Sequence, residues 1–151
     1  ARHIFAVDVG HGQIDSKLRA NPAVTVVEKC NARFLTPQEL IALTPLASEI
    51  SLAVVDVSFI SLAKIVEPVF KNFSAIRDWV VLFKPQFEVG PENLRKGGVV
   101  KDEQTALDAL QSFRTFAEIL GLNLRASTAS KLAGKKSGNL EYLLHYENIQ
   151  T

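Results

Sequence analysis

The sequence predicts an α/β domain with a mainly parallel sheet, and three observations support this fold class. Four short apolar runs, rich in β-branched residues, each have a polar residue at or just after their end, as buried strands do where they reach solvent. These runs are Ile4 to Val9, Val24 to Glu28, Leu52 to Val57 and Trp79 to Phe83. Helical patterns alternate with the later runs, which is typical of parallel sheets with helices on both faces. The composition, 47% hydrophobic and 22% charged, suits one globular domain comprising residues 1–151.

Two helices have clear start or stop signals. Thr36 to Glu39 combines an N-cap threonine, a proline at the first helical position and a glutamate that completes a capping box. We expect a helix from there to Leu43. The strongest helical pattern runs from Asp102 to Leu120, with Gly121 as its stop signal. Residues 60–69 also suit a helix that lies on a sheet.

The remaining segments are a long loop and two closing strands. Residues 84–102 carry several glycines and prolines, and a loop of this length in a compact domain is often functional. Strands are expected at Leu122 to Thr128 and Leu140 to Tyr146, with the polar segment 130–138 between them. We expect the last strand to be antiparallel to the others.

The composition argues against several classes of protein. The single cysteine, Cys30, lacks the neighbours of a zinc site, and the three histidines are scattered, so we expect no metal. No apolar run approaches the ~20 residues that span a bilayer, and the N-terminus has no signal-peptide pattern. We therefore expect a cytoplasmic protein without a membrane segment. The net charge of +1 does not by itself indicate a nucleic-acid-binding protein.

Polar residues at the strand ends are candidates for a ligand site. Ligands of open parallel sheets bind beyond the carboxyl ends of the strands, where Asp8, Glu28, Asp56 and Lys84 are expected. One such residue could simply mark the end of a strand, whereas four at equivalent positions indicate a lined cleft. Glu141 stands within an apolar run, where an unpaired carboxylate is costly, so we expect a cationic partner and select Lys84.

The segment after the first run allows two interpretations. Gly10 and Gly12 could form a glycine-rich cofactor loop, or they could belong to an ordinary turn. Residues 13–19 leave little room for a helix that would pack over a ligand, which favours the turn without excluding the loop.

Four motifs together resemble one known family. They are Val55-Asp56-Val57-Ser58-Phe59-Ile60-Ser61-Leu62, Lys84-Pro85-Gln86-Phe87-Glu88-Val89-Gly90, Lys96-Gly97-Gly98-Val99-Val100 and Gly138-Asn139-Leu140-Glu141-Tyr142. From about Phe5 to Tyr146 the chain resembles the TlyA family, the hemolysin-labelled ribosomal RNA methyltransferases with an FtsJ-like catalytic domain. The resemblance implies a Rossmann-like class I methyltransferase sheet. It also implies 2′-O-methylation of ribosomal RNA at a cytidine ribose, with S-adenosylmethionine as cofactor.

The resemblance assigns catalytic roles to three residues. FtsJ-type enzymes use a tetrad of lysine, aspartate, lysine and glutamate, and its last three members match Asp56, Lys84 and Glu141. Lys84 is the candidate general base that removes the proton of the ribose hydroxyl. The first lysine of the tetrad would lie upstream of Ala1.

The resemblance also assigns cofactor contacts. Asp8 would contact the cofactor ribose, Asn31 and Ala32 would lie beside the adenine, and Asp56 would lie between cofactor and substrate. The first strand, the glycine-rich loop and an N-terminal RNA-binding domain would all precede this chain. On this interpretation Gly10 and Gly12 are not the cofactor loop, and the chain by itself is inactive.

Several basic residues could contact RNA, and two alternative functions can be compared with the sequence. Phosphate contacts are candidates at five basic residues that could equally be solvated loop residues: Arg95, Lys96, Lys131, Lys135 and Lys136. A membrane-active hemolysin would need an amphipathic segment, for which residues 102–120 are the candidate, although they suit a sheet-covering helix better. A nicotinamide-dependent oxidoreductase would need a G-x-G-x-x-G motif, which does not occur.

Overall fold

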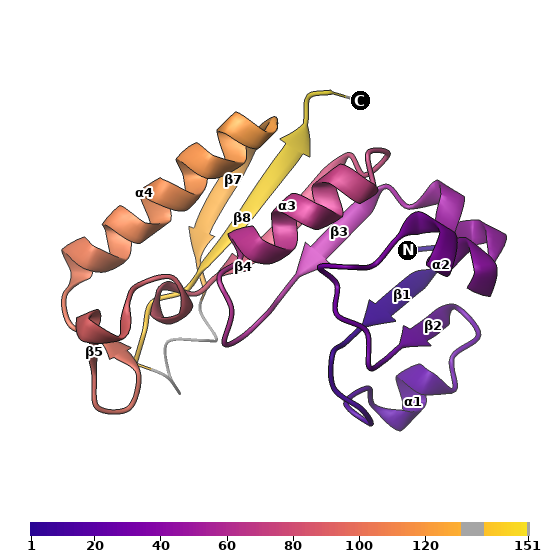
Figure 1. The fold of residues 1–151 in the computed structure, drawn as a ribbon, viewed down its shortest axis with the longest axis horizontal. Helices are drawn as coiled ribbons and strands as arrows, with labels where there is room; N and C mark the ends of the chain where they lie inside the picture. Colours follow the sequence, from indigo (N-terminus) through magenta and orange to yellow (C-terminus); the bar gives the residue numbers. More distant parts are fainter. Residues whose placement is uncertain (131–137, 151) are drawn as a thin grey trace.

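A computed structural model of the chain describes residues 1–130 and 138–150 (Figure 1). The elements follow in the order β1 (Ile4–Val7), α1 (Ser16–Arg19), β2 (Val24–Val27), α2 (Pro37–Leu43), η1 (Pro45–Glu49), β3 (Leu52–Val55), α3 (Ala63–Asn72), β4 (Asp78–Phe83), η2 (Pro85–Phe87), η3 (Pro91–Asn93), β5 (Leu94–Arg95), β6 (Val99–Val100), α4 (Glu103–Leu120), β7 (Leu122–Ala129) and β8 (Tyr142–Asn148). The predicted alternation of strands and helices is therefore present.

The strand pairings give a mixed sheet with an antiparallel last strand. β1 pairs in parallel with β2, and β3 pairs in parallel with β4. β8 lies between β4 and β7 and is antiparallel to both, so the larger sheet has the order β3-β4-β8-β7. The predicted class and the orientation of the last strand are confirmed.

The strands form two separate sheets, with the gap where the family resemblance places the absent first strand, between the strand ending in Asp8 and the strand ending in Asp56. β1 and β2 form a two-stranded sheet of their own, and no ladder joins β1 to β3. In Figure 1 the arrowheads of β1, β2 and β3 point to the same side of the molecule. The strand ends that carry polar residues therefore lie on one side although the two sheets are not joined by hydrogen bonds.

Local sequence signals correctly predicted the helix ends. The Thr36 side chain accepts from the Glu39 backbone, and the Glu39 side chain accepts from the Thr36 backbone, which completes the capping box of α2. The Asp102 side chain caps α4, and Gly121 ends this helix in the left-handed conformation, with φ of 104°. These ends depend on hydrogen bonds between near neighbours, so sequence reasoning could predict them.

Two predicted segments differ from the structure. The loop 84–102 contains two short 3-10 helices and the β5–β6 hairpin, whose turn includes Gly97 and Gly98 at φ of 94° and 78°. Positive φ at both positions is the geometry of a tight hairpin turn and favours glycine. The last strand begins at Tyr142, so Glu141 stands just before β8 and not within a strand.

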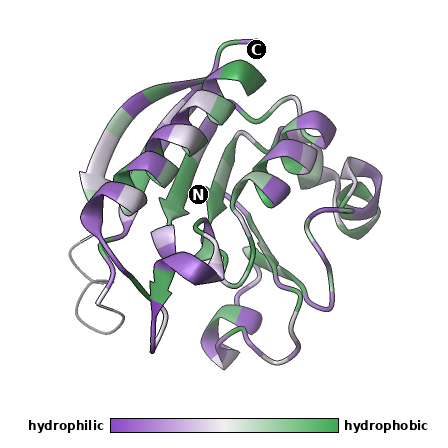
Figure 2. Cartoon of the chain, turned by 60° about the vertical axis from the view of Figure 1, so that its left-hand side comes forward, coloured by the Kyte–Doolittle hydropathy of each residue, from purple (hydrophilic) through white to green (hydrophobic). Residues whose placement is uncertain are grey.

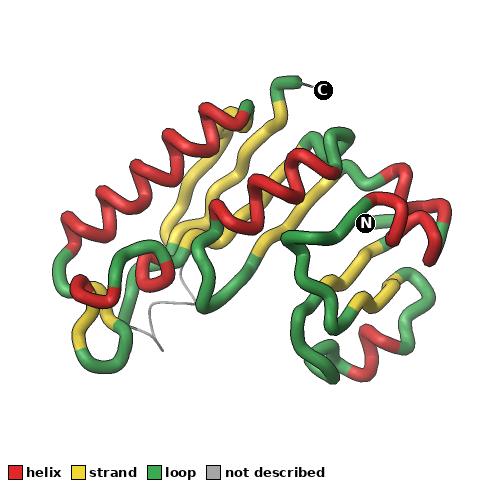
Figure 3. The backbone as a smooth tube through the Cα atoms, viewed as in Figure 1, coloured by secondary structure: helices red, strands yellow, loops and turns green. Residues whose placement is uncertain are grey.

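The hydrophobic core lies between the four-stranded sheet and two helices. Figure 3 shows α3 and α4 side by side over one face of this sheet. Trp79, Val81 and Phe83 of β4 are fully buried, and the Phe113 ring of α4 lies 5.6 Å from the Phe83 ring. In Figure 2 the central strands of the sheet are hydrophobic, whereas the helices mix hydrophilic and hydrophobic residues. This packing fixes β4, at whose end Lys84 stands.

The opposite face of the same sheet carries an apolar patch that is partly exposed. Val54 lies opposite Val80, and Leu82 lies opposite Leu143, so these four residues share one face. Val54 is 71% exposed and Leu143 is 40% exposed. Strands with apolar residues on both faces are typical of sheets that are covered on both sides.

The packing predicts different effects for two substitutions in α4. Phe113→Ala should lower the free energy of unfolding by about 3–5 kcal/mol, because it leaves a cavity between α4, β4 and β8. Ile119→Ala is the control, since Ile119 is 81% exposed on the same helix, and it should cost no more than about 0.5 kcal/mol. Urea unfolding followed by the fluorescence of Trp79, the single tryptophan, measures both. Equal losses in the two variants would contradict this description of the core.

Candidate active site

Asp56 and Lys84 meet at the carboxyl edge of the larger sheet. β3 and β4 are parallel with Val55 opposite Val81, so the residues that follow them reach the same edge. The Nζ atom of Lys84 lies 2.6 Å from Oδ1 of Asp56 and 3.1 Å from Oγ of Ser58. The Lys84 side chain is only 14% exposed, whereas that of Asp56 is 61% exposed. The prediction that these two residues share one edge is confirmed.

The predicted ion pair between Lys84 and Glu141 is wrong. Oε1 of Glu141 accepts a hydrogen bond of 2.8 Å from Nε2 of Gln86. Within residues 1–130 and 138–150, the ion pairs within 4.0 Å include none between Lys84 and Glu141. The strand order explains this difference. β4 lies between β3 and β8, and Lys84 reaches toward β3 whereas Glu141 stands on the β8 side.

The turn after β4 contacts both neighbouring segments. Residues 85–87 form one turn of 3-10 helix, in which successive side chains point in different directions. The Phe87 ring lies 5.0 Å from the Phe59 ring. The Glu88 carboxylate accepts a hydrogen bond of 2.6 Å from the backbone N–H of Leu62, just before α3. Burial raises the pKa of Glu88, while hydrogen bonds from Leu62 and Ser61 act in the opposite direction.

Phe59 is an exposed aromatic residue that sequence reasoning missed. Its residue surface is 91% exposed, and its backbone has a φ of 62°, which is uncommon for any residue except glycine. It follows directly on Ser58, the hydroxyl partner of Lys84. Strained backbone of this kind persists where the surroundings enforce it, and it clusters at functional sites. An aromatic residue just after the strand-end aspartate was the available sequence signal.

Asp8 stands at the end of β1 and is held by three hydrogen bonds with backbone groups, one of which its own N–H donates to the Val27 carbonyl at 3.0 Å. Its Oδ1 atom accepts a hydrogen bond of 2.6 Å from the N–H of Gly10, and its carbonyl accepts one of 3.0 Å from Cys30. In the described part of the chain, Oδ2 of Asp8 has no hydrogen bond or ion pair. One carboxylate oxygen of Asp8 is thus available to a ligand hydroxyl.

Glu28 directly follows β2, and its carboxylate accepts hydrogen bonds from the loop that follows β1. Its side chain is 7% exposed, and Oε1 accepts from the backbone N–H groups of Gln13 (2.8 Å) and Ile14 (3.3 Å). Arg19 approaches the same oxygen to 2.9 Å, and His11 lies 3.3 Å from Oε2. The backbone hydrogen bond from Gly12 has the largest effect on the pKa of Glu28, which burial alone would raise. Together with the Arg19 guanidinium and the backbone N–H groups of Ile14 and Gln13, it lowers this pKa to about 2. This carboxylate organises residues 11–19 and is not a free ligand group.

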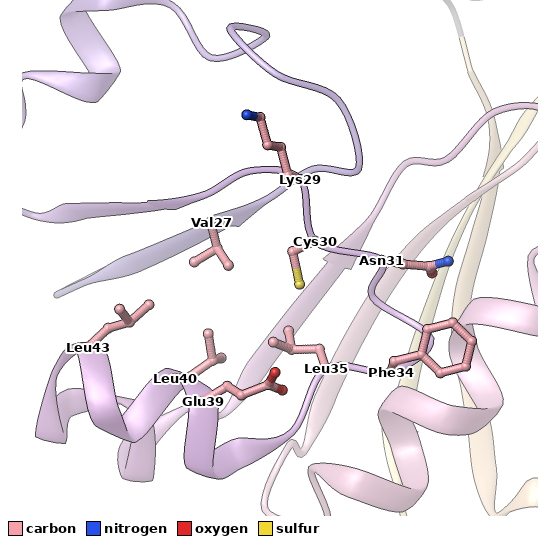
Figure 4. A pocket seen from close by; sticks show the side chains of 9 residues that line it. All are labelled: Val27, Lys29, Cys30, Asn31, Phe34, Leu35, Glu39, Leu40 and Leu43. Atoms are coloured by element: carbon pink, nitrogen blue, oxygen red, sulfur yellow. The ribbon is translucent and has the colours of Figure 1, made fainter.

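A pocket of about 400 Å³ lies between the end of β2 and α2 (Figure 4). Its walls are mainly apolar, with Val27, Leu35, Leu40 and Leu43 among the lining residues. Asn31 is the one predicted cofactor residue in the lining, and Ala32 packs against the core. The Cys30 thiol also lines the pocket, and burial, assisted by the charge of Glu39, raises its pKa. Asp8, Asp56, Lys84 and Glu141 lie outside this lining.

Of the five basic residues predicted to contact RNA phosphates, the structure describes two, Arg95 and Lys96. The Arg95 guanidinium donates to the carbonyl of Lys101 (2.6 Å), and Lys96 is exposed in the hairpin turn. Lys131, Lys135 and Lys136 lie outside the described residues. Among the residues that are described, no cluster of three or more metal-ligating side chains occurs. No helix in the same residues is long and apolar enough to cross a membrane.

The family model of FtsJ-like methyltransferases matches residues 1–148. The chain belongs to the FtsJ-like methyltransferase family. It is 41% identical over 144 residues to the 16S/23S rRNA (cytidine-2′-O)-methyltransferase TlyA of Mycobacterium tuberculosis, and 35% identical over 146 residues to Hemolysin A of Brachyspira hyodysenteriae. These matches cover 95% and 97% of the chain, but only 51% and 58% of the relatives. The chain therefore spans little more than half the length of these relatives.

Solved structures agree with the family assignment. A structure from Streptococcus thermophilus that carries a hemolysin name superposes with a TM-score of 0.83 at 34% sequence identity. The superposition covers 98% of this chain and 51% of that one. The FtsJ-like methyltransferase fold and the resemblance drawn from the sequence motifs are both confirmed.

The contacts of Glu28 predict an effect of pH on stability. Because its pKa is lowered from 4.5 to about 2, the folded state binds fewer protons there than the unfolded state. The stabilisation is complete above pH ~4.5 and is lost as the pH falls toward ~2. We expect Glu28→Gln to reduce the loss of unfolding free energy over this range, as measured by urea unfolding at several pH values. The exposed Glu118→Gln is the control, and an identical pH dependence in wild type and Glu28→Gln would contradict the proposed contacts.

Proposed function

We propose that the protein carrying this chain is an S-adenosylmethionine-dependent 2′-O-methyltransferase that acts on ribosomal RNA at a cytidine ribose. The observation that supports this function most directly is the Lys84–Asp56 pair beside the buried Glu141 in a chain of the FtsJ-like family. Relatives from Mycobacterium tuberculosis and Campylobacter jejuni are named as rRNA (cytidine-2′-O)-methyltransferases. The activity would be cytoplasmic, where ribosomal RNA is found.

The three catalytic candidates suit the chemistry of methyl transfer to a hydroxyl. A ribose hydroxyl is a weak nucleophile until it loses its proton, so the reaction needs a positioned base. When bound, the cofactor supplies an electrophilic methyl group on a sulfonium. Lys84, in its neutral form, would take the hydroxyl proton while the oxygen attacks, and Asp56 and Ser58 hold its amine in place. Asp56 and Glu141 supply negative charge that balances the ammonium formed.

The residues proposed to bind the cofactor stand at the carboxyl ends of strands, where open parallel sheets bind ligands. Asp8 has an available carboxylate oxygen, which we assign to a hydroxyl of the cofactor ribose. Asn31 and Ala32, just after the end of β2, are assigned to the adenine, and Asp56 to the boundary between cofactor and substrate. Phe59, exposed beside Asp56, is assigned to stacking on the target base, because unstacked RNA bases bind aromatic side chains.

A further strand would complete the sheet. β1 and β3 have parallel directions but no ladder between them, and the exposed face with Val54 is apolar. A central strand placed between them would pair both edges, and a helix following it would cover the exposed face. We propose that a preceding segment of the parent protein supplies this βα unit together with the glycine-rich loop. Gly10 and Gly12 then belong to the turn that holds Asp8.

The hemolysin name of some relatives does not change this proposal. The amphipathic helix that a membrane-active protein would need is α4. Its apolar residues Leu110, Phe113 and Ala117 are buried against the sheet, so they form core contacts.

Replacement of the base should affect turnover more than binding. In the full-length parent protein, Lys84→Ala should lower kcat by about 10²–10⁴-fold, with a smaller effect on the KM for the cofactor. Lys64→Ala, an exposed lysine on α3, is the control and should keep wild-type turnover. Phe59→Ala should raise the KM for RNA in the same assay, which follows methyl transfer from labelled cofactor to ribosomal subunits. Wild-type turnover by Lys84→Ala would remove this residue from the mechanism.

The divided sheet predicts weak cofactor binding by the chain of 151 residues alone. Without a strand between β1 and β3 and its loop, backbone donors that would hold the methionine end are lacking. Titration calorimetry should therefore detect weak binding or none, and the isolated chain should not methylate ribosomal RNA. Micromolar affinity, measured on protein of verified mass, would contradict this prediction and return Gly10 and Gly12 to consideration as the cofactor loop.

A further inference from the structure

Glu141 is a buried carboxylate that needs a hydrogen-bond donor. Its residue surface is 5% exposed, and an ionised carboxylate at such a position is costly unless donors surround it. Lys84 does not provide the contact, because its amine lies 2.6 Å from Asp56 on the other side of β4. The side-chain amide of Gln86 provides it, through Nε2 at 2.8 Å.

The orientation of Gln86 is explained by Glu141. In the described part of the chain, the Oε1 atom of Gln86 is buried without a hydrogen-bond partner. Rotating the amide by half a turn would place Oε1 against the Glu141 carboxylate, so only the observed orientation is compatible with an ionised glutamate. A buried carbonyl without a partner is unfavourable, so the hydrogen bond from Nε2 to Glu141 offsets a cost that this orientation carries.

The turn that carries Gln86 is fixed at several points. Pro85 is fully buried, and the backbone N–H of Phe87 donates to the Lys84 carbonyl at 3.0 Å. Glu88 anchors the far end of the turn to Leu62. On the other side, the Glu141 carbonyl accepts a hydrogen bond of 2.7 Å from Ser130. Both partners of the side-chain hydrogen bond thus have anchored backbones.

We propose that Gln86 is a positioning residue, which holds the Glu141 carboxylate on the β8 side of the site and so leaves the Lys84 amine to Asp56 and Ser58. This inference rests on the proposed methyltransferase function. Lys84 and Gln86 are separated by one residue in the 3-10 turn, and they hold one carboxylate each on opposite sides of β4. Gln86 acts on the reaction only through Glu141.

Kinetics of the full-length parent protein test this role. Gln86→Leu, which keeps the size but removes the donor, should lower kcat on ribosomal RNA by about 10–100-fold, the effect of leaving one buried partner unpaired. The KM for the cofactor should stay within about twofold, because Gln86 does not contact the cofactor residues. Gln111→Leu, an exposed glutamine on α4, is the matched control and should keep wild-type kcat.

A double-mutant cycle separates positioning from a general structural effect. In a Glu141→Gln background, Gln86→Leu should cause no further loss of kcat, because the carboxylate on which Gln86 acts is gone. Losses that multiply independently would overturn the inference. If Gln86→Leu does not fold, as judged by Trp79 fluorescence, Gln86→Glu replaces it, because it keeps the shape, offers no N–H donor and should lose at least as much kcat. Wild-type kcat in either variant, with an active wild-type parent, overturns the role of Gln86 alone, whereas an inactive parent overturns the proposed function.

Discussion

The active edge depends on the parallel register between β3 and β4, because this pairing brings Val55 opposite Val81 and allows Asp56 and Lys84 to meet just beyond. The register is held by packing, since Trp79, Val81 and Phe83 are buried under α3 and α4. A slip of one residue would turn these side chains to the opposite face, so the core strongly disfavours it. The position of the lysine is therefore determined by the most deeply buried strand of the domain.

The same strand separates the two carboxylates of the site. β4 lies between β3 and β8, so the Lys84 amine at the end of β4 can contact a carboxylate on one side only. It forms its ion pair with Asp56, on the β3 side. The second carboxylate, Glu141, is held by the amide of Gln86, and among residues 1–130 and 138–150 it forms no ion pair. An amide holds a carboxylate in place without adding the positive charge that an ion pair would bring.

The two acidic residues at the strand ends of the smaller sheet, Asp8 and Glu28, differ in their contacts. Asp8 keeps an oxygen available, whereas the Glu28 carboxylate is occupied by backbone N–H groups and by Arg19. Both belong to one arrangement, because the loop that Glu28 organises begins with the glycine that holds Asp8. A buried carboxylate thus shapes the loop, whereas the Asp8 carboxylate keeps one oxygen without a hydrogen bond among the described residues.

Features that depend on contacts between near neighbours could be predicted from the amino-acid sequence. Buried strands, the capping box at Thr36 and Glu39, and the stop of α4 at Gly121 could be predicted because hydrogen bonds and burial patterns within a few residues specify them. The motifs around Asp56, Lys84 and Glu141 also indicated the family, which the comparison with known proteins confirmed. The partner of each charged group depends on the strand order, which is set by contacts between residues distant in sequence. For this reason the contacts of Lys84 with Asp56 and of Glu141 with Gln86 could be assigned only from the folded chain. The exposure of Phe59 escaped prediction for the same reason, because exposure is a property of the assembled fold. The gap between β1 and β3, by contrast, lies where the family resemblance places the absent first strand.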